Sequence, residues 1–405
     1  MRATLATLWT TPGLRACSVA IFCFGFTGAA TSPYQSVVAI RELGLSDAAF
    51  SALTLMAALL NVVASIVLGV LADRDSGYRK LLMVLAACGV LGFGATFLAR
   101  SPWVFVLAVL GPLSVFGGLF SLLFAAGRVF SGDLPRTEQA SVSSALRALI
   151  SVAWILVPGL VGLALSSSDT LLPAYLVAAL VSLGLLAVIR FMMPRGGGGD
   201  ASTRPPRMSF AAAFGLLLRP ALALRVLAAA LVTATLHVNG AVMPLIVTGQ
   251  AQGVPGDVGT IVGLVAAIEV AFILVWARIL RHLSIVAALG LGVGLYVVYL
   301  VWLAHALSPG AVIAASVVGG IGAAAIISLP LGYLQDLIAD RPGLSSSLLS
   351  INMFLAGALA AGLFALGTSL GGYPTVALLG AAAGALGGLG LLALEGFRIA
   401  PPDPT

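Results

Sequence analysis

The sequence predicts an all-α integral membrane protein of twelve transmembrane helices in two pseudo-symmetric six-helix bundles. The first observation is composition: 60% of the 405 residues are hydrophobic and only 8% are charged, whereas a soluble domain carries roughly 25% charged residues. The second is the recurrence of apolar runs long enough to cross a bilayer, which takes about 20 residues. The third is one long polar segment that separates these runs into two groups of six.

Twelve apolar runs are the expected spans, and most connections between them are short. They cover residues 15–39, 48–72, 80–99, 102–130, 142–165, 172–193, 220–248, 255–278, 284–306, 309–335, 343–368 and 373–396. The connection after the sixth run is longer and rich in Gly, Arg and Pro, which is typical of a flexible linker. We therefore predict an N-terminal bundle at 1–194, a cytoplasmic linker at 195–219 and a C-terminal bundle at 220–405.

The basic residues predict which side of the membrane each connection faces. With both termini and the linker placed in the cytoplasm, 17 of the 20 Lys and Arg residues lie at or near the inner side. Arg41 and Arg100 lie outside, and Arg147 falls within the fifth span. Because cytoplasmic connections carry an excess of Lys and Arg, this distribution predicts cytoplasmic termini. The first apolar run is longer than a signal-peptide core of about 7–15 residues, so we expect it to remain as a span.

The sequence lacks the motifs that are typical of metal-binding proteins, enzymes and ATP-driven pumps. Cys17, Cys23 and Cys88 lie in apolar runs without metal-ligand spacing, so no metal site is expected. No phosphate-binding loop or H-E-x-x-H motif occurs, so we expect neither an enzyme nor an ATP-driven pump, and no cofactor. The net charge of +6 reflects cytoplasmic arginines rather than nucleic-acid binding. A channel remains as a non-enzymatic alternative, and it would show flux without saturation or proton dependence.

The segment after the second span reads GVLADRDSGYRK, Gly69 to Lys80. It resembles the loop signature of the major facilitator superfamily, which is glycine-x-leucine-alanine-aspartate-arginine followed by glycine and basic residues. The spacing departs from that signature, because Asp75, Ser76 and Tyr78 interrupt it. The matching residues are Gly69, Leu71, Ala72, Asp73, Arg74, Gly77, Arg79 and Lys80. The resemblance implies the major facilitator fold, and the layout of two groups of six spans agrees with it.

Three further segments are similar to the bacterial sugar efflux transporter family of that superfamily. They are SSALRALISVAW in the fifth span, AAIEVAFIL in the eighth and LQDLIADRPG after the tenth. This resemblance implies a multi-pass protein of the bacterial inner membrane that exports sugars or sugar-like small molecules in exchange for protons, by alternating access. Its expected partners are the substrate, protons and membrane lipid, and we expect a monomer.

Two alternatives within transport stay open, a proton-coupled multidrug exporter and a sugar/proton symporter. Drug exporters of the superfamily usually carry an arginine in the middle of the fourth span, whereas here Arg128 lies near the inner end. The segment VPGLVG, Val157 to Gly162, is only a partial version of their glycine-proline motif. Both observations favour sugar export over drug export.

Glu269 lies in the middle of the eighth span, about nine residues or roughly 13 Å from Arg278. Because an ionised carboxylate in hydrocarbon is costly, this group must be neutral, paired or in contact with water. We interpret Glu269 as the proton-coupling site rather than as a hydrogen-bonded structural acid. Histidine titrates near neutrality, so His237 in the seventh span is the alternative proton carrier.

Arg147 lies about one and a half turns inside the fifth span and cannot lose its charge. Ser151 and Trp154 share its helix face, four and seven residues on. A charge, a hydroxyl and an aromatic ring on one face suit a sugar ring, so we interpret all three as substrate-binding residues. The alternative is an Arg147 side chain that extends to the nearby membrane surface.

Neutral polar side chains deeper in the spans suit a ligand rich in hydroxyl groups. Each alone is more often an interhelical hydrogen bond, worth about 0.6 kcal/mol, but as a set they predict a cavity. The further substrate-binding candidates are Tyr34, Gln35, Asn61, Asn239 and Asn352.

Charged residues at the inner ends of the spans are interpreted as gating residues. By resemblance, Asp73 and Arg74 tether the two bundles in the outward-open state. The full gating set is Asp73, Arg74, Arg79, Arg128, Asp133 and Asp336. In the last span Gly380, Gly384 and Gly388 recur every four residues, which permits close helix packing. We expect these glycines to serve packing within the chain, with dimerisation as the alternative.

Overall fold

A computed structural model describes residues 7–74, 78–132, 134–165, 168, 170–194, 219–337 and 342–396. Within these ranges twelve helical segments are long and apolar enough to cross a membrane. The described residues form helices and no strand. These findings confirm the predicted all-α membrane fold.

The first six spans include two composite ones, in which the helix type changes along the span. The first runs through α2 (Pro12–Thr31), a 3-10 turn η1 (Ser32–Tyr34), α3 (Gln35–Val37) and a π-helical turn η2 (Val38–Glu42). The fourth runs through α6 (Pro102–Ala108), a π-helical turn η3 (Val109–Leu113), α7 (Ser114–Phe116) and α8 (Leu119–Phe130). The other four are α4 (Asp47–Arg74), α5 (Tyr78–Ala99), α9 (Arg136–Ala164) and α10 (Pro173–Phe191).

Each of the last six spans is a single α-helix in the described structure. They are α12 (Pro220–Thr248), α13 (Pro255–Ile279), α14 (Ile285–His305), α15 (Pro309–Asp336), α16 (Pro342–Gly371) and α17 (Tyr373–Glu395). The irregular helix geometry found among the described spans is therefore confined to the first and fourth.

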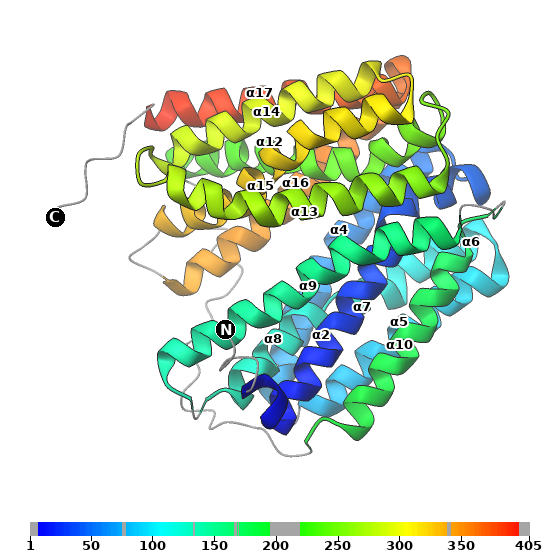
Figure 1. Cartoon of the computed structure of the whole chain (residues 1–405), viewed down its shortest axis with the longest axis vertical. Helices are drawn as coiled ribbons and strands as arrows, with labels where there is room; N and C mark the ends of the chain where they lie inside the picture. The colour runs from blue at the N-terminus through cyan, green and yellow to red at the C-terminus, as the bar shows by residue number, and fades with distance from the viewer. Residues whose placement is uncertain are drawn as a thin grey trace. The chain divides into compact units, whose positions relative to one another are not determined.

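The chain divides into two compact units, of which one contains Met1–Leu45 with Met56–Arg204 and the other Ser46–Leu55 with Pro205–Thr405. In the first unit α2 packs on α9 and α10, and α5 packs on α10 (Figure 1). In the second unit α12 packs on α16 and α17, and α14 packs on α17. The first span thus contacts the fifth and sixth, and the third contacts the sixth, in both units. This repeated scheme is the pseudo-symmetry that the sequence predicts.

The start of α4 belongs to the second unit. There the Tyr373 hydroxyl donates to Asp47 Oδ1 at 3.0 Å, and the Ser51 hydroxyl donates to the Ala361 carbonyl at 2.5 Å. The Phe50 and Phe364 rings meet edge to face, with centroids 5.5 Å apart. Two hydrogen bonds and one aromatic contact therefore fix this end of the helix within its unit.

Proline fixes the starts of many of the long helices. It occupies the first or second position of α2, α6, α10, α12, α13, α15 and α17. Its fixed φ suits the first helical turn, and its missing N–H has no intrahelical partner to lose there. In α13 the start is fixed further by Asp257, whose carboxylate accepts a hydrogen bond from the Val254 N–H at 2.8 Å. These helices therefore begin at defined residues.

Glycines of α17 allow the backbones of the second unit to approach closely. A Cβ at Gly387 would lie 2.7 Å from the Ala228 carbonyl oxygen and 3.0 Å from the Val232 nitrogen, both backbone atoms of α12. At Gly384 it would lie 2.7 Å from Thr235 Cγ2, again on α12. At Gly380 the nearest atom would be Val238 Cγ1, at 2.8 Å. Gly380 and Gly384 of the predicted stripe, and Gly387 beside it, are therefore used for packing inside their own unit.

Candidate functional site

Glu269 lies near the middle of α13, fourteen residues after Pro255 and nine before Arg278. These separations correspond to about 21 and 13 Å along a helix, which places the carboxyl deep in the span. Its side chain is half-buried and makes no hydrogen bond or ion pair with the described residues. The carboxylate lies within electrostatic range of the Tyr296 hydroxyl on α14. Among the described residues this acid therefore has no cationic partner.

Two buried tyrosines of α14 connect this acid to a neighbouring amide. The rings of Tyr296 and Tyr299 lie with centroids 5.2 Å apart. The Tyr299 hydroxyl donates a hydrogen bond to Asn239 Oδ1 on α12 at 2.7 Å. Asn239 is thus hydrogen-bonded to this pair of tyrosines, and Glu269 is near enough to Tyr296 to act on it electrostatically.

A second polar group in the same unit is centred on Thr233 of α12. The Asn352 amide nitrogen donates to Thr233 Oγ1 at 3.1 Å, and His237 Nδ1 lies 3.2 Å from the Thr233 carbonyl oxygen. Asn352 is fully buried, and its Oδ1 has no hydrogen-bond partner among the described residues. His237 itself is exposed. Asn352 and His237 thus share one threonine, and no described contact joins them to Glu269.

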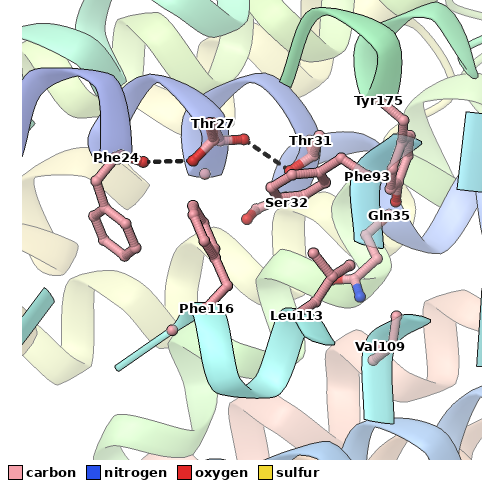
Figure 2. A pocket seen from close by; sticks show the side chains of 12 residues that line it. Phe24, Thr27, Thr31, Ser32, Gln35, Phe93, Val109, Leu113, Phe116 and Tyr175 are labelled. Atoms are coloured by element: carbon pink, nitrogen blue, oxygen red, sulfur yellow. Dashed lines mark hydrogen bonds between the residues drawn. The ribbon is translucent and has the colours of Figure 1, made fainter. Parts of the chain in front are cut away.

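The first unit contains a cavity of about 200 Å³ (Figure 2). It is lined by residues of α2, η1, α3, α5, η3, α7 and α10. Aromatic rings form much of its wall, and its polar lining comes from the consecutive turns of the first span. The aromatic residues are Phe24, Phe93, Phe116 and Tyr175, and the polar ones are Thr27, Thr31, Ser32 and Gln35. Of the predicted substrate-binding residues, Gln35 lines this cavity.

The remaining predicted substrate residues of this unit lie around the cavity or away from it. Tyr34 is fully buried, and its hydroxyl donates to the Pro158 carbonyl at 2.9 Å. Asn61 places its amide nitrogen 3.5 Å from the Ser114 carbonyl oxygen, next to the wall of the cavity. Gly28 lines the cavity, and Trp154 is the side chain nearest to the position that a Cβ at Gly28 would take. Arg147 is exposed on α9, and Ser151 is half-buried one turn further on.

The structure describes the side chains of only some of the predicted gating residues. Arg79 at the start of α5 donates to the Ile189 carbonyl at 3.2 Å and also to the Arg190 carbonyl at the end of α10. Arg128 is exposed at the end of α8. Asp336 lines a second cavity, of about 280 Å³, together with Tyr333 and Glu395. The side chains of Asp73 and Arg74, and residue Asp133, lie outside the described part of the structure.

One motif of hydrolases does occur, as Gly367 to Gly371 reads G-T-S-L-G. A nucleophile elbow places that serine on a sharp turn between a strand and a helix. Here the segment lies within α16, and the Ser369 hydroxyl donates to the Leu366 carbonyl at 2.8 Å. The segment therefore lacks the turn that a catalytic serine of this motif requires.

Sequence reasoning missed most of the cavity. It selected amides and charged groups within the spans, and it passed over Thr27, Thr31, Ser32 and Tyr175. Two signals point to these residues. Thr27 and Thr31 lie four residues apart on one helix face, on either side of Gly28, and Pro33 follows within a predicted span. Proline inside a span frees a backbone carbonyl that other groups must satisfy.

Two six-helix units that span a membrane, each with polar groups held inside it, define a polytopic membrane transporter. The family model of the Major Facilitator Superfamily matches residues 17–361, so the chain belongs to that family. It is therefore a transporter and not an enzyme.

Known proteins agree with this assignment at two levels. A protein of Deinococcus radiodurans named "Putative sugar efflux transporter" is 28% identical over 372 residues, which cover 90% of this chain and 93% of that protein. The crystal structure of the nucleoside transporter NupG matches with a TM-score of 0.78 at 13% identity, over 96% of this chain and 100% of that one. A peptide transporter POT in complex with sulfate matches with a TM-score of 0.77 at 15% identity, over 94% of each chain. The two solved structures share the fold.

Proposed function

We propose that this transporter exports a sugar or sugar-like small molecule from the cytoplasm in exchange for protons, by alternating access of its two units. The observation that carries the proposal is the Glu269 carboxyl, which lies deep in α13 and has no ionic or hydrogen-bonding partner among the described residues. The similarity to the Deinococcus radiodurans protein supports the substrate class and the direction of transport.

Proton exchange follows from the cost of a buried charge. Placing an ionised acid at the centre of a bilayer costs several kcal/mol or more, so intramembrane acids lie at proton or substrate pathways. A lysine or arginine partner would hold Glu269 ionised throughout the cycle, and none is found in the described structure. Glu269 can therefore bind a proton when the site faces one side of the membrane and release it on the other.

The surroundings of Glu269 suit a neutral, hydroxyl-bearing substrate. The Tyr296 and Tyr299 rings are buried, whereas Asn239, which accepts a hydrogen bond from the Tyr299 hydroxyl, is only half-buried and keeps an amide available to a ligand. Hydroxyl and amide groups exchange hydrogen bonds with sugar hydroxyls at little cost, because both sides can donate and accept. We propose Glu269 as the group that binds the coupling proton, and Asn239 as a polar group available to the substrate.

The exchange is tested in inverted membrane vesicles, whose lumen corresponds to the outside of the cell. With an acidified lumen, a labelled neutral hexose or disaccharide should accumulate, and its addition should make the lumen less acidic. A protonophore should abolish both effects. Accumulation of a lipophilic cation without any sugar would identify a multidrug exporter. Release of preloaded sugar would identify a symporter, and equilibration without accumulation would identify a channel; each of these results would overturn the proposal.

We further propose that the protein lies in the bacterial inner membrane with both termini in the cytoplasm. In a background without Cys17, Cys23 and Cys88, a single cysteine at Gln252 should react with a membrane-impermeant thiol reagent in intact cells. Gln252 is exposed between α12 and α13. A single cysteine at Ser202, in the predicted linker, should react only after the cells are opened. Labelling at position 202 in intact cells would reverse the orientation.

A further inference from the structure

The cavity of the first unit contains polar groups that lack partners. The Tyr175 side chain is 2% exposed, and its hydroxyl makes no hydrogen bond to any described residue. The Gln35 amide and the Ser32 hydroxyl also make none. Figure 2 shows these side chains around the same space, with the Ser32 hydroxyl pointing into it. Tyr175 is buried, Gln35 is half-buried and Ser32 is exposed. A buried polar group without a partner costs about 1–3 kcal/mol, so the Tyr175 hydroxyl in particular calls for a molecule that can hydrogen-bond to it.

The threonines of the cavity are available as acceptors. The Thr27 hydroxyl donates to the Phe24 carbonyl at 2.7 Å, and the Thr31 hydroxyl donates to the Thr27 carbonyl at 2.8 Å. Each hydroxyl hydrogen is therefore engaged along the helix, whereas the oxygen lone pairs stay open. Together with Gln35 and Tyr175 the cavity offers both donors and acceptors, as a polyhydroxylated ligand requires.

The opposite wall is a connected set of aromatic rings. The Phe116 ring lies 5.4 Å from that of Phe24 and 5.5 Å from that of Phe93, and Phe93 lies 6.2 Å from Tyr175, all between centroids. Phe93 and Phe116 meet edge to face, the other two pairs are tilted, and such ring contacts hold the side chains in place. An apolar wall facing a few placed polar groups is the usual construction of a small-molecule site.

The backbone around the cavity departs from the α-helix on two sides. The 3-10 turn Ser32–Tyr34 and the π-helical turn Val109–Leu113 both contribute lining residues. Single π-helical turns within helices occur frequently at functional sites. Each turn contains a proline, Pro33 and Pro112, which cannot donate a backbone hydrogen bond.

Charge and size limit what the cavity can hold. None of the described lining residues is charged. Glu42 acts electrostatically on Tyr175 but is not a lining residue, and its carboxylate accepts hydrogen bonds from Thr170 and from the Leu171 N–H, both at 2.6 Å. A charged ligand would be desolvated without a partner, and an anion would also meet Glu42. The volume of about 200 Å³ is below the roughly 300–1,000 Å³ typical of sites for drug-sized ligands.

We infer that this cavity is a binding site for one uncharged sugar ring within the first unit. Gln35 and Tyr175 form hydrogen bonds with the hydroxyls of the sugar, and the Phe116 ring packs against its apolar face. The choice of a sugar over other neutral hydroxylated molecules rests on the proposed function. The site is separate from the Glu269 group, since all of its lining residues belong to the first unit. It selects for a single neutral ring and against uronic acids, amino sugars and sugar phosphates.

The test is binding to the purified full-length protein in detergent, without any proton gradient. A radiolabelled neutral hexose should bind, and the matching uronic acid and amino sugar should bind at least tenfold more weakly. Gly28→Leu should reduce hexose binding at least tenfold, because a Cβ at Gly28 meets nothing closer than Trp154 Cζ2 at 3.9 Å and a longer side chain extends into the cavity. Tyr175→Phe, which removes only the hydroxyl, should weaken hexose binding several-fold.

Gly184→Leu on the exposed face of α10 is the matched control, because a Cβ there meets no atom within 4 Å. It should bind hexose as the unmodified protein does. Unchanged binding in both Gly28→Leu and Tyr175→Phe would overturn the inference, as would a protein that binds no neutral hexose and holds water alone. If Gly28→Leu does not fold, hexose binding by Tyr175→Phe alone tests the inference. Binding without accumulation in vesicles would refute the proposed export and leave this site standing.

Discussion

Glu269→Gln is expected to abolish pH-driven accumulation of substrate while leaving substrate binding measurable. Glutamine has nearly the shape of the protonated acid but cannot release a proton. Rocking of the two units does not itself require a change of charge, so exchange of substrate across a membrane without a gradient should persist. The measurement is uptake into vesicles with and without an imposed pH difference, together with equilibrium binding in detergent.

The pH dependence of binding has a defined sign. In an antiporter the proton and the substrate compete, so binding to the unmodified protein should weaken as the pH falls and Glu269 becomes protonated. The glutamine variant should bind equally at every pH, with the affinity that the unmodified protein shows at acid pH. Asp257→Asn, in the first turn of the same helix, is the matched control and should accumulate substrate normally. A Glu269→Gln protein that still concentrates substrate would exclude this acid and point to His237.

Gly387→Ala is expected to destabilise the second unit, although alanine is the better helix former. The added Cβ would lie 2.7 Å from the Ala228 carbonyl oxygen and 3.0 Å from the Val232 nitrogen. These are backbone atoms of α12, so relief requires the two helices to separate. Overpacking of this kind costs about 1–3 kcal/mol, and separation also forfeits the packing that holds helices together in lipid. The measurement is thermal unfolding of the full-length protein in detergent.

Gly294→Ala is the same chemical change as Gly387→Ala, but we expect it to leave the stability unchanged or to raise it. A Cβ at Gly294 of α14 meets no atom within 4 Å, so the helix gains the propensity difference of up to about 1 kcal/mol. Its melting temperature should stay the same or rise, while that of Gly387→Ala falls. Equal effects at the two positions would mean that the close approach of α17 to α12 does not contribute to stability.

The spans were predictable because hydropathy alone determines them. All twelve predicted runs correspond to long helices, and most boundaries differ by three residues or fewer. What hydropathy cannot show is the type of helix within a span. The first predicted run, 15–39, is observed as a succession of α, 3-10 and π segments from Pro12 to Glu42. All three helix types bury the same apolar residues, so composition does not distinguish them.

The candidate sites were predictable where a single residue is unusual for its surroundings. Glu269 and Gln35 are conspicuous in apolar runs, and the structure places each beside aromatic side chains. Tyr175 and Ser32 were missed because tyrosine and serine are common near the ends of spans. Their significance depends on which helices face each other, which the order of residues along the chain does not state. The glycine stripe of α17 shows the same limit, since its spacing fits internal packing and dimerisation equally well.

The proline at the start of α13 has a consequence for insertions and deletions in this part of the gene. Because the fixed φ of proline suits the first turn of a helix and its missing N–H has no partner to lose there, Pro255 favours the same helix start when a residue is added. One residue added between Pro255 and Glu269 would move the carboxyl about 1.5 Å along the axis and turn it by about 100°. Such a turn would point the acid in a different direction. Length changes in this stretch should therefore be far more damaging than most substitutions, even though hydropathy would hardly register them.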